Sequence, residues 1–118
     1  MKKCVLIYDD DAEILFLCEK ILEKQYRVKS LLKCQYIIED ITRIQPDIIL
    51  MDLWIPTIGG EKAVQIMKND PLIKLIPVIL FSANAEINEI CERIGADGFI
   101  AKPFDVNDFR EIIKRNIL

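Results

Sequence analysis

The 118-residue sequence contains no histidine, only one tryptophan, and no apolar run long enough to cross a bilayer. Four cysteines lie far apart along the chain without a Cys-X-X-Cys pair, so no zinc-ligand pattern is present. Such cysteines are typical of small buried side chains in a reducing compartment. The aspartates that follow MKKCVLIY also interrupt any signal-peptide core. We therefore predict a cytoplasmic protein in which Cys4, Cys18, Cys34 and Cys91 are buried.

An excess of basic residues is also lacking. The 16 lysines and arginines are outnumbered by 19 aspartates and glutamates, which gives a net charge of −3 and a pI near 5.0. Direct nucleic-acid binding by this chain is therefore disfavoured. The length fits one domain, residues 1–118, with a single sizeable core.

The stretch PDIILMDLWIPTIGG, residues 46–60, places a charged residue where an apolar strand stops. Ile48 to Met51 form an unbroken apolar run, which is typical of a strand covered on both faces in a parallel sheet. A carboxylate inside such a strand is costly to desolvate, so Asp52 is predicted at the strand's carboxyl end. Pro56, Gly59 and Gly60 then predict a loop that presents Asp52 to solvent.

The rest of the chain alternates between strand and helix patterns. Apolar runs predict strands over residues 4–8, 27–32, 48–51, 78–81 and 98–101. Helical spacing follows each run, in the sets 14/17/18/21, 37/41/44, 63/64/67, 87/90/91/94 and 106/109/113/117. Asp11 and Asp105 are predicted helix N-caps, and Gly95 a helix terminator. This order predicts a three-layer, doubly wound α/β fold with a five-stranded parallel sheet.

Polar residues follow four of the predicted strands. Ligands bind such sheets outside the carboxyl ends of the strands, so Asp9, Asp10, Asp52, Ser82 and Lys102 are expected to line one crevice. Two carboxylates about 4 Å apart repel by about 4 kcal/mol at an effective dielectric of about 20. Lys102 supplies one positive charge, and an all-oxygen site suits Mg²⁺. A phosphoryl group could then bind, with Asp52 as the nucleophile that forms an acyl phosphate.

These residues resemble the receiver domains of bacterial two-component response regulators. The resemblance runs through four separated motifs in the family's order: LIYDDDAEI with Asp9 and Asp10, DIILMDLWIPTIGG with Asp52, IPVILFSA with Ser82, and GADGFIAKPF with Lys102. It implies a flavodoxin-like fold with strand order 2-1-3-4-5. It also implies a role in two-component signalling rather than ordinary enzyme catalysis.

The resemblance assigns roles to the crevice residues. Asp52 would accept a phosphoryl group from a sensor histidine kinase or a histidine phosphotransfer protein, assisted by Lys102 and Ser82. Asp10 would bind Mg²⁺ directly and Asp9 mainly through water, with Asp52 and the Trp54 backbone carbonyl as further ligands. No other cofactor is implied.

A conformational switch is implied as well. Phosphorylation would draw Ser82 toward the phosphoryl group and let the Phe99 ring turn inward. This would reshape the face formed by the fourth helix, fifth strand and fifth helix, where an output protein or domain, or a second copy of the chain, would bind. Trp54 and Asn84 are the predicted modulators of the acyl phosphate's lifetime, and the Lys102–Pro103 bond is expected to be cis.

The sequence departs from the family pattern in two places. Gly59 stands where the family has an acidic residue, and the run from Leu32 to Gln35 lacks the family's usual glycine. Taken singly, each crevice residue also fits a structural role, such as a helix cap or a solvated strand end. The other phosphate-binding classes lack their motifs, because Trp54 replaces the second acid of haloacid-dehalogenase-type phosphatases and no GxxxxGK is present. The alternative is a receiver-like interaction module that works without phosphorylation.

Overall fold

The computed structural model describes residues 2–117, in which five strands alternate with five helices as predicted. The strands are β1 (Lys3–Tyr8), β2 (Tyr26–Leu31), β3 (Ile48–Asp52), β4 (Val78–Ser82) and β5 (Gly98–Ala101). The helices are α1 (Ala12–Leu22), α2 (Ile37–Ile44), α3 (Gly60–Lys68), α4 (Ile87–Ile94) and α5 (Val106–Asn116). Met1 and Leu118, the ends of the predicted domain, lie outside the described residues.

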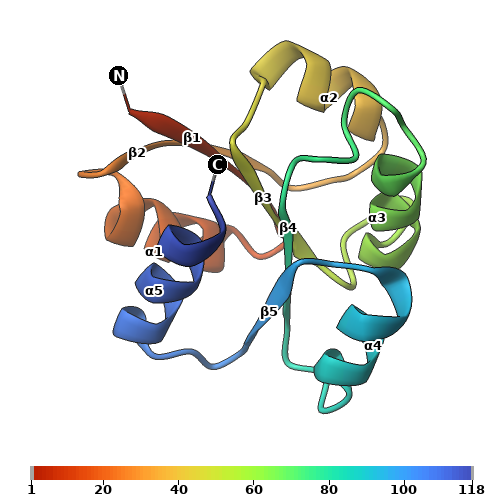
Figure 1. Ribbon diagram of the computed structural model, residues 1–118. Helices are drawn as coiled ribbons and strands as arrows, with labels where there is room; N and C mark the ends of the chain where they lie inside the picture. The colour runs from red at the N-terminus through yellow and green to blue at the C-terminus, as the bar shows by residue number, and fades with distance from the viewer. Residues whose placement is uncertain (1, 118) are drawn as a thin grey trace.

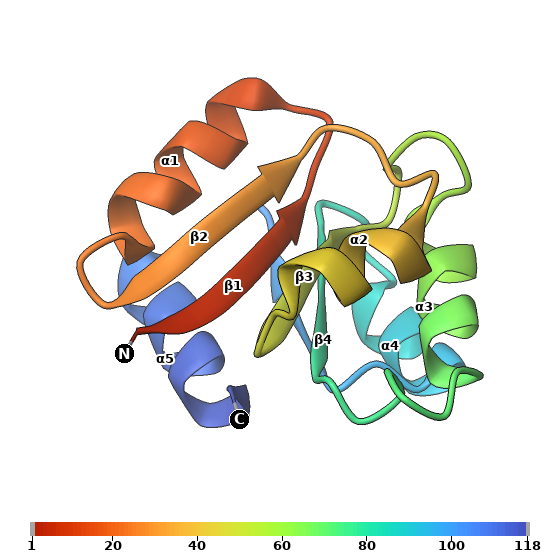
Figure 2. The ribbon, with the colours of Figure 1, turned by 90° about the horizontal axis from the view of Figure 1, so that it is seen from above.

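The strands form one parallel sheet in the order β2-β1-β3-β4-β5, which confirms the predicted order. Helices α1 and α5 cover one face of this sheet, and α2, α3 and α4 cover the other (Figures 1 and 2). The three-layer α/β arrangement is therefore confirmed. Strands β3 and β4, which lie inside the sheet, are buried along their whole lengths, as expected for strands covered on both faces.

Alternation along the strands divides the core in two. Leu6, Tyr8 and Met51 pack on the side of α2, α3 and α4, whereas Ile7 and Leu50 pack on the side of α1 and α5. Because side chains on a strand alternate between faces, the residues two positions beyond Ile7 and Leu50 also point toward α1 and α5. These residues are Asp9 and Asp52, so the sheet delivers both carboxylates to the same side.

Helix ends follow the predicted signals. The Asp11 carboxylate accepts hydrogen bonds from the backbone N–H groups of Glu13 and Ile14, and Asp105 caps α5 in the same way. Gly95 ends α4 in the left-handed conformation, with φ of 78°. These three predictions are confirmed.

Part of the predicted packing of α1 is wrong. We expected Leu17 on the buried stripe, but it is 45% exposed, and Leu15, Cys18 and Leu22 are the buried residues of the helix. Residues 14–17 are all apolar, so helical spacing alone fits more than one buried face. The same correction applies to Val106 of α5, which is 39% exposed at the start of its helix.

The second strand lies one residue earlier than predicted, so Leu32 falls outside it and is half exposed. The following Cys34 is buried and pairs in parallel fashion with Thr57. The Cys34 carbonyl accepts the N–H groups of Thr57 and Ile58, and its own N–H donates to the Pro56 carbonyl. This pairing joins the segment where the family's usual glycine is absent to the loop that follows Asp52.

All four cysteines are free and buried, as predicted. Burial raises the pKa of the Cys18 and Cys34 thiols to about 12, so both are protonated at neutral pH. They act as small apolar side chains. Among the described helices, none has the length and apolar character that a membrane span requires.

Candidate functional site

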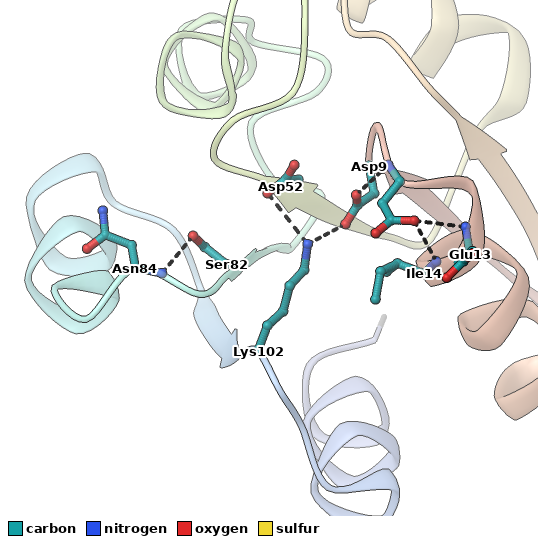
Figure 3. Close-up of polar contacts among 8 residues, drawn as sticks. Asp9, Glu13, Ile14, Asp52, Ser82, Asn84 and Lys102 are labelled. Carbon is teal, nitrogen blue, oxygen red and sulfur yellow. Dashed lines mark hydrogen bonds and ion pairs between the residues drawn. The ribbon is translucent and has the colours of Figure 1, made fainter.

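Carboxylates and one lysine meet at the carboxyl end of the sheet. One carboxylate oxygen from each of Asp9, Asp10 and Asp52 lies within 4.8 Å of the other two. Lys102 Nζ lies 2.6 Å from Asp9 Oδ2 and 3.7 Å from Asp52 Oδ1, and Figure 3 shows its side chain extending toward both acids. The structure therefore brings together four of the five predicted strand-end residues in direct proximity.

The burial of this cluster differs from the prediction. Asp52 was expected to be presented to solvent, but it is only 4% exposed, and Asp9 is fully buried. Lys102 extends over Asp52, and the loop beyond it turns inward through the buried side chains of Leu53 and Ile55. An enclosed carboxylate interacts more strongly with neighbouring charges than a solvated one does.

The two acids after β1 have different surroundings. Asp9 accepts the backbone N–H of Asp11 on Oδ1 and the Lys102 ammonium on Oδ2, so both of its oxygens are engaged. Asp10 is exposed. The Asp10 carboxylate is therefore the more accessible of the two to an ion from solvent.

Burial raises the pKa of Asp52 from its ordinary value of 3.8 to about 6. The positive charge of Lys102 and a backbone hydrogen bond from Trp54 lower this pKa. The negative charges of Asp9 and Asp10 raise it further. Desolvation therefore outweighs the nearby ammonium, although Asp52 is still largely ionised at neutral pH. The result is a carboxylate of raised basicity at the centre of the site.

Asp52→Asn is expected to stabilise the protein in Mg²⁺-free buffer at pH 7. Between pH 4 and 6 the folded protein binds more protons at Asp52 than the unfolded chain does, so this group's contribution to stability is lost as the pH rises through about 6. The rise in pKa corresponds to about 3 kcal/mol. The variant should thus gain up to about 3 kcal/mol above pH 7 and almost nothing at pH 4, measured by urea unfolding across this range.

The exposed Asp108 supplies the control for this experiment. Asp108→Asn removes one carboxylate from the surface of α5, so it should change the free energy of unfolding by less than about 1 kcal/mol at every pH. A gain for Asp52→Asn that does not vary with pH would show that its carboxylate carries no desolvation cost.

The donor set fits a divalent ion. Three carboxylates supply only oxygen, and Lys102 offsets just one of their negative charges. Hard oxygen ligands with excess negative charge suit Mg²⁺ and Ca²⁺, and a small set completed by water suits Mg²⁺ in particular. The residues present therefore agree with the predicted metal.

Ser82, the fifth predicted residue, faces the other side of the sheet. It follows Leu80, which packs toward α4, by two positions, and Leu80 pairs in register with Phe99 of β5. Ser82 is buried, and its Oγ accepts the backbone N–H of Asn84 at 3.1 Å (Figure 3). Phe99 is half-buried against the same α4 side of the core. The predicted switch pair therefore shares one face of the sheet.

The two predicted modulators lie on different loops, Trp54 after β3 and Asn84 after β4. The Trp54 side chain is 72% exposed on the loop after β3. Asn84 is half-buried, and its side-chain oxygen accepts the Glu86 N–H at 2.8 Å, in a turn that leads into α4. The Lys102–Pro103 bond is cis, as predicted.

One neighbour of the cluster was missed by the sequence analysis. Lys102 Nζ lies 4.5 Å from the centroid of the Phe81 ring. In the sequence, Phe81 is one more apolar residue of a buried strand. Its position beside Asp52 is visible only in the register of β3 and β4, where the two residues are paired.

Comparisons with known proteins agree with this geometry. The family model of the response regulator receiver domain matches residues 5–114. Sporulation initiation phosphotransferase F of Bacillus subtilis is 30% identical over 98% of this chain and 94% of its own length. The phosphate regulon transcriptional regulatory protein PhoB of Pseudomonas aeruginosa is 32% identical over 96% of this chain, which spans only 49% of that protein.

A solved structure shares the fold. The receiver domain of sensor histidine kinase PA1611 from Pseudomonas aeruginosa, determined with a magnesium ion coordinated in its active site cleft, superposes with a TM-score of 0.88. The two are 24% identical over 98% of each chain. At this identity the likeness concerns the fold.

Proposed function

The chain belongs to the response regulator receiver family, and from this we propose that it is a phosphoacceptor whose receiving atom is a carboxylate oxygen of Asp52. Receiver domains act in two-component phosphorelay signalling as signalling domains rather than as classical enzymes. The proposed domain spans residues 1–118. The observation that carries the proposal is the ammonium of Lys102 held between Asp9 and Asp52 in a cluster of three carboxylates.

The proposed reaction is an in-line transfer from a phosphohistidine donor. An oxygen of Asp52 forms a bond to phosphorus while the phosphorus–nitrogen bond to the donor imidazole breaks, and the imidazole leaves with the electron pair. The Lys102 ammonium, already 3.7 Å from Asp52, is placed to contact an oxygen of the arriving phosphoryl group. Asp52 is available for attack because its carboxyl is ionised above its pKa of about 6.

Mg²⁺ is the proposed cofactor, held by Asp9, Asp10, Asp52 and the Trp54 backbone carbonyl. Asp10 is exposed and contributes a direct ligand, whereas Asp9 is already bonded to Lys102 and contributes through water. When bound, the ion supplies positive charge that offsets the carboxylates and the phosphoryl oxygens. The magnesium described for the related receiver of P. aeruginosa supports this assignment.

We propose that Ser82 and Phe99 convert phosphorylation into a change of surface. Ser82 would exchange its hydrogen bond with the Asn84 N–H for one with the phosphoryl group, and Phe99 on the same face would move inward. The altered surface is the face of α4, β5 and α5, where the output protein or domain, or a second copy of the chain, binds. Trp54 and Asn84 modulate the lifetime of the acyl phosphate from the loops on either side.

The upstream partner proposed is a sensor histidine kinase or a histidine phosphotransfer protein. The chain spans nearly all of the sporulation phosphotransferase but about half of PhoB, so the comparisons include relatives with and without a large additional region. Nucleic-acid binding is not proposed for these 118 residues because their net charge is −3.

Intact-mass measurement with a small acyl phosphate donor tests the proposal. Wild type and Asp108→Asn are expected to gain one phosphoryl group when Mg²⁺ is present and none after chelation. Asp52→Asn should gain none in either condition, while circular dichroism shows that it remains folded. If folded wild type stays unmodified throughout, the phosphoacceptor role is refuted and the phosphorylation-independent interaction module becomes the better explanation.

A further inference from the structure

The topology requires the Lys102 side chain to cross a neighbouring strand. Lys102 follows β5, whereas its partner Asp52 ends β3 and its partner Asp9 follows β1, and β4 lies between β5 and β3. Lys102 comes two residues after Ile100, which packs on the α1 and α5 side, so the lysine starts on the same face as the two acids. The residue of β4 on this face at this level is Phe81, which pairs in register with Asp52.

The contact between Lys102 and Phe81 has the geometry of a cation–π interaction. The ammonium lies 4.5 Å from the ring centroid, within the distance of about 6 Å at which such attraction is significant. Phe81 is fully buried and the Lys102 side chain is only 19% exposed, so the attraction is weakly screened by solvent. A leucine or valine at this position would bury the lysine stem equally well but would not attract its charge.

The ring itself is held in place by two other aromatic side chains. Phe81 lies 5.5 Å from the centroid of Phe104 and 6.0 Å from that of Phe109, tilted by 52° and 53°. Phe104 and Phe109 stack on each other at 4.8 Å. This contact with a stacked aromatic pair restricts rotation of the Phe81 ring, so its face stays oriented toward the site.

We propose that Phe81 is a positioning residue that holds the Lys102 ammonium beside Asp52 before the phosphoryl group arrives. Without the ring, the closer Asp9 would attract the ammonium away from Asp52, and the flexible four-carbon stem of Lys102 would allow it to move. With the ring present, the ammonium is already held where it can contact an oxygen of the incoming phosphoryl group. The Lys102 side chain therefore loses less conformational freedom during the transfer. This inference rests on the proposed phosphoacceptor function and adds a residue that the strand-end pattern does not include.

Fluorination of the ring separates charge attraction from packing. Successive fluorine atoms weaken the negative face of a phenyl ring while changing its size little. Phenylalanine analogues with one, two and three ring fluorines, incorporated at position 81, should therefore slow phosphorylation by acetyl phosphate in saturating Mg²⁺ in steps, by about five-fold in total. The same analogues at Phe109, which packs on Phe81, should leave the rate unchanged.

A second measurement does not depend on phosphoryl transfer. The ε-methylene protons of Lys102 should show an upfield ring-current shift in NMR spectra of wild type, which Phe81→Leu loses and which Phe16→Leu, a change on the exposed surface of α1, retains. A flat fluorination series in a chain that accepts the phosphoryl group, or an ε-methylene signal unaffected by Phe81→Leu, overturns the inference alone. A wild-type chain that accepts no phosphoryl group refutes the proposed function, and the positioning role falls with it.

Discussion

Gly60→Ala is expected to lower the free energy of unfolding by about 3 kcal/mol or more, a large part of the total for a domain of this size. Gly60 begins α3 and is buried where that helix meets the end of β3. A Cβ at this position would overlap the Asp52 carbonyl oxygen and lie 2.8 Å from the Leu53 Cα. These are backbone atoms, so no rotamer change relieves the contact. Urea unfolding at pH 7 measures the effect.

Gly95→Ala is the matched control, because it adds the same methyl group at an exposed helix end, where it meets no clash. Gly95 has φ of +78°, and nothing lies within 4 Å of the position its Cβ would take. Only the strain of the left-handed conformation remains, which costs about 1 kcal/mol. If the two variants lose equal stability, the close approach at Gly60 is not what makes glycine necessary there.

The same close approach couples the fold to the site. Gly60 also donates its N–H to the Leu53 carbonyl at 3.0 Å, so α3 is docked directly on the chain at Asp52 and Leu53. A methyl group that pushes α3 away must shift Asp52 relative to Asp9 and Asp10. Folded Gly60→Ala is therefore expected to bind Mg²⁺ more weakly than Gly95→Ala does.

The strands and their order along the chain were predictable because four of the five are continuous apolar runs bounded by polar or turn residues. The strand over 26–31 was misplaced by one residue because it alternates between exposed and half-buried positions at the sheet edge, where the pattern is weaker. The buried face of α1 was misjudged because its apolar residues are too many for their spacing to select one face. The strand order came from the family resemblance and not from local pattern.

At the site, the rule that parallel strands end at one edge was sufficient to gather Asp9, Asp10, Asp52 and Lys102. It could not predict how deeply Asp52 is buried, because that depends on the inward packing of Leu53 and Ile55 and on the pairing of Cys34 with the same loop. Phe81 was missed for a related reason. Phe81 contributes to the site only because the Lys102 side chain lies over its ring. That contact depends on the register between strands, which the local sequence pattern does not reveal.

Lys102→Met is expected to lower the free energy of unfolding by about 3 kcal/mol or more at pH 7 in Mg²⁺-free buffer. Methionine keeps the apolar stem but removes the charge that pairs with a fully buried carboxylate, Asp9, at 2.6 Å. Removing one partner of a buried ion pair leaves the other charge uncompensated, which is far more costly than breaking a surface pair. The loss should shrink on acidification, since protonation of Asp52, whose pKa is already raised to about 6, removes one of the charges that Lys102 no longer balances.

Lys68→Met is the control, because Lys68 pairs with the partly exposed Asp97 at 3.0 Å. Such a pair is worth at most about 1 kcal/mol, so this variant should unfold close to wild type. If Lys102→Met is no less stable than Lys68→Met, the buried ion pair between Lys102 and Asp9 contributes no more to stability than the partly exposed pair does.

Mg²⁺ should restore much of the stability that Lys102→Met loses, because the proposed Mg²⁺ site consists of three carboxylates that come together only when the chain is folded. At a concentration 100 times its dissociation constant, an ion with a single native site adds about 2.7 kcal/mol. Without the competing ammonium, the carboxylates of Lys102→Met should also bind Mg²⁺ more tightly than those of Lys68→Met, so the gain at a fixed Mg²⁺ concentration should be larger. Equal gains in the two variants, measured by thermal unfolding during a Mg²⁺ titration, would show that the lysine and the metal do not share these carboxylates. A larger gain for Lys102→Met would identify Lys102 as the charge that balances Asp9 and Asp52 while no metal is bound, and a smaller gain would contradict this role.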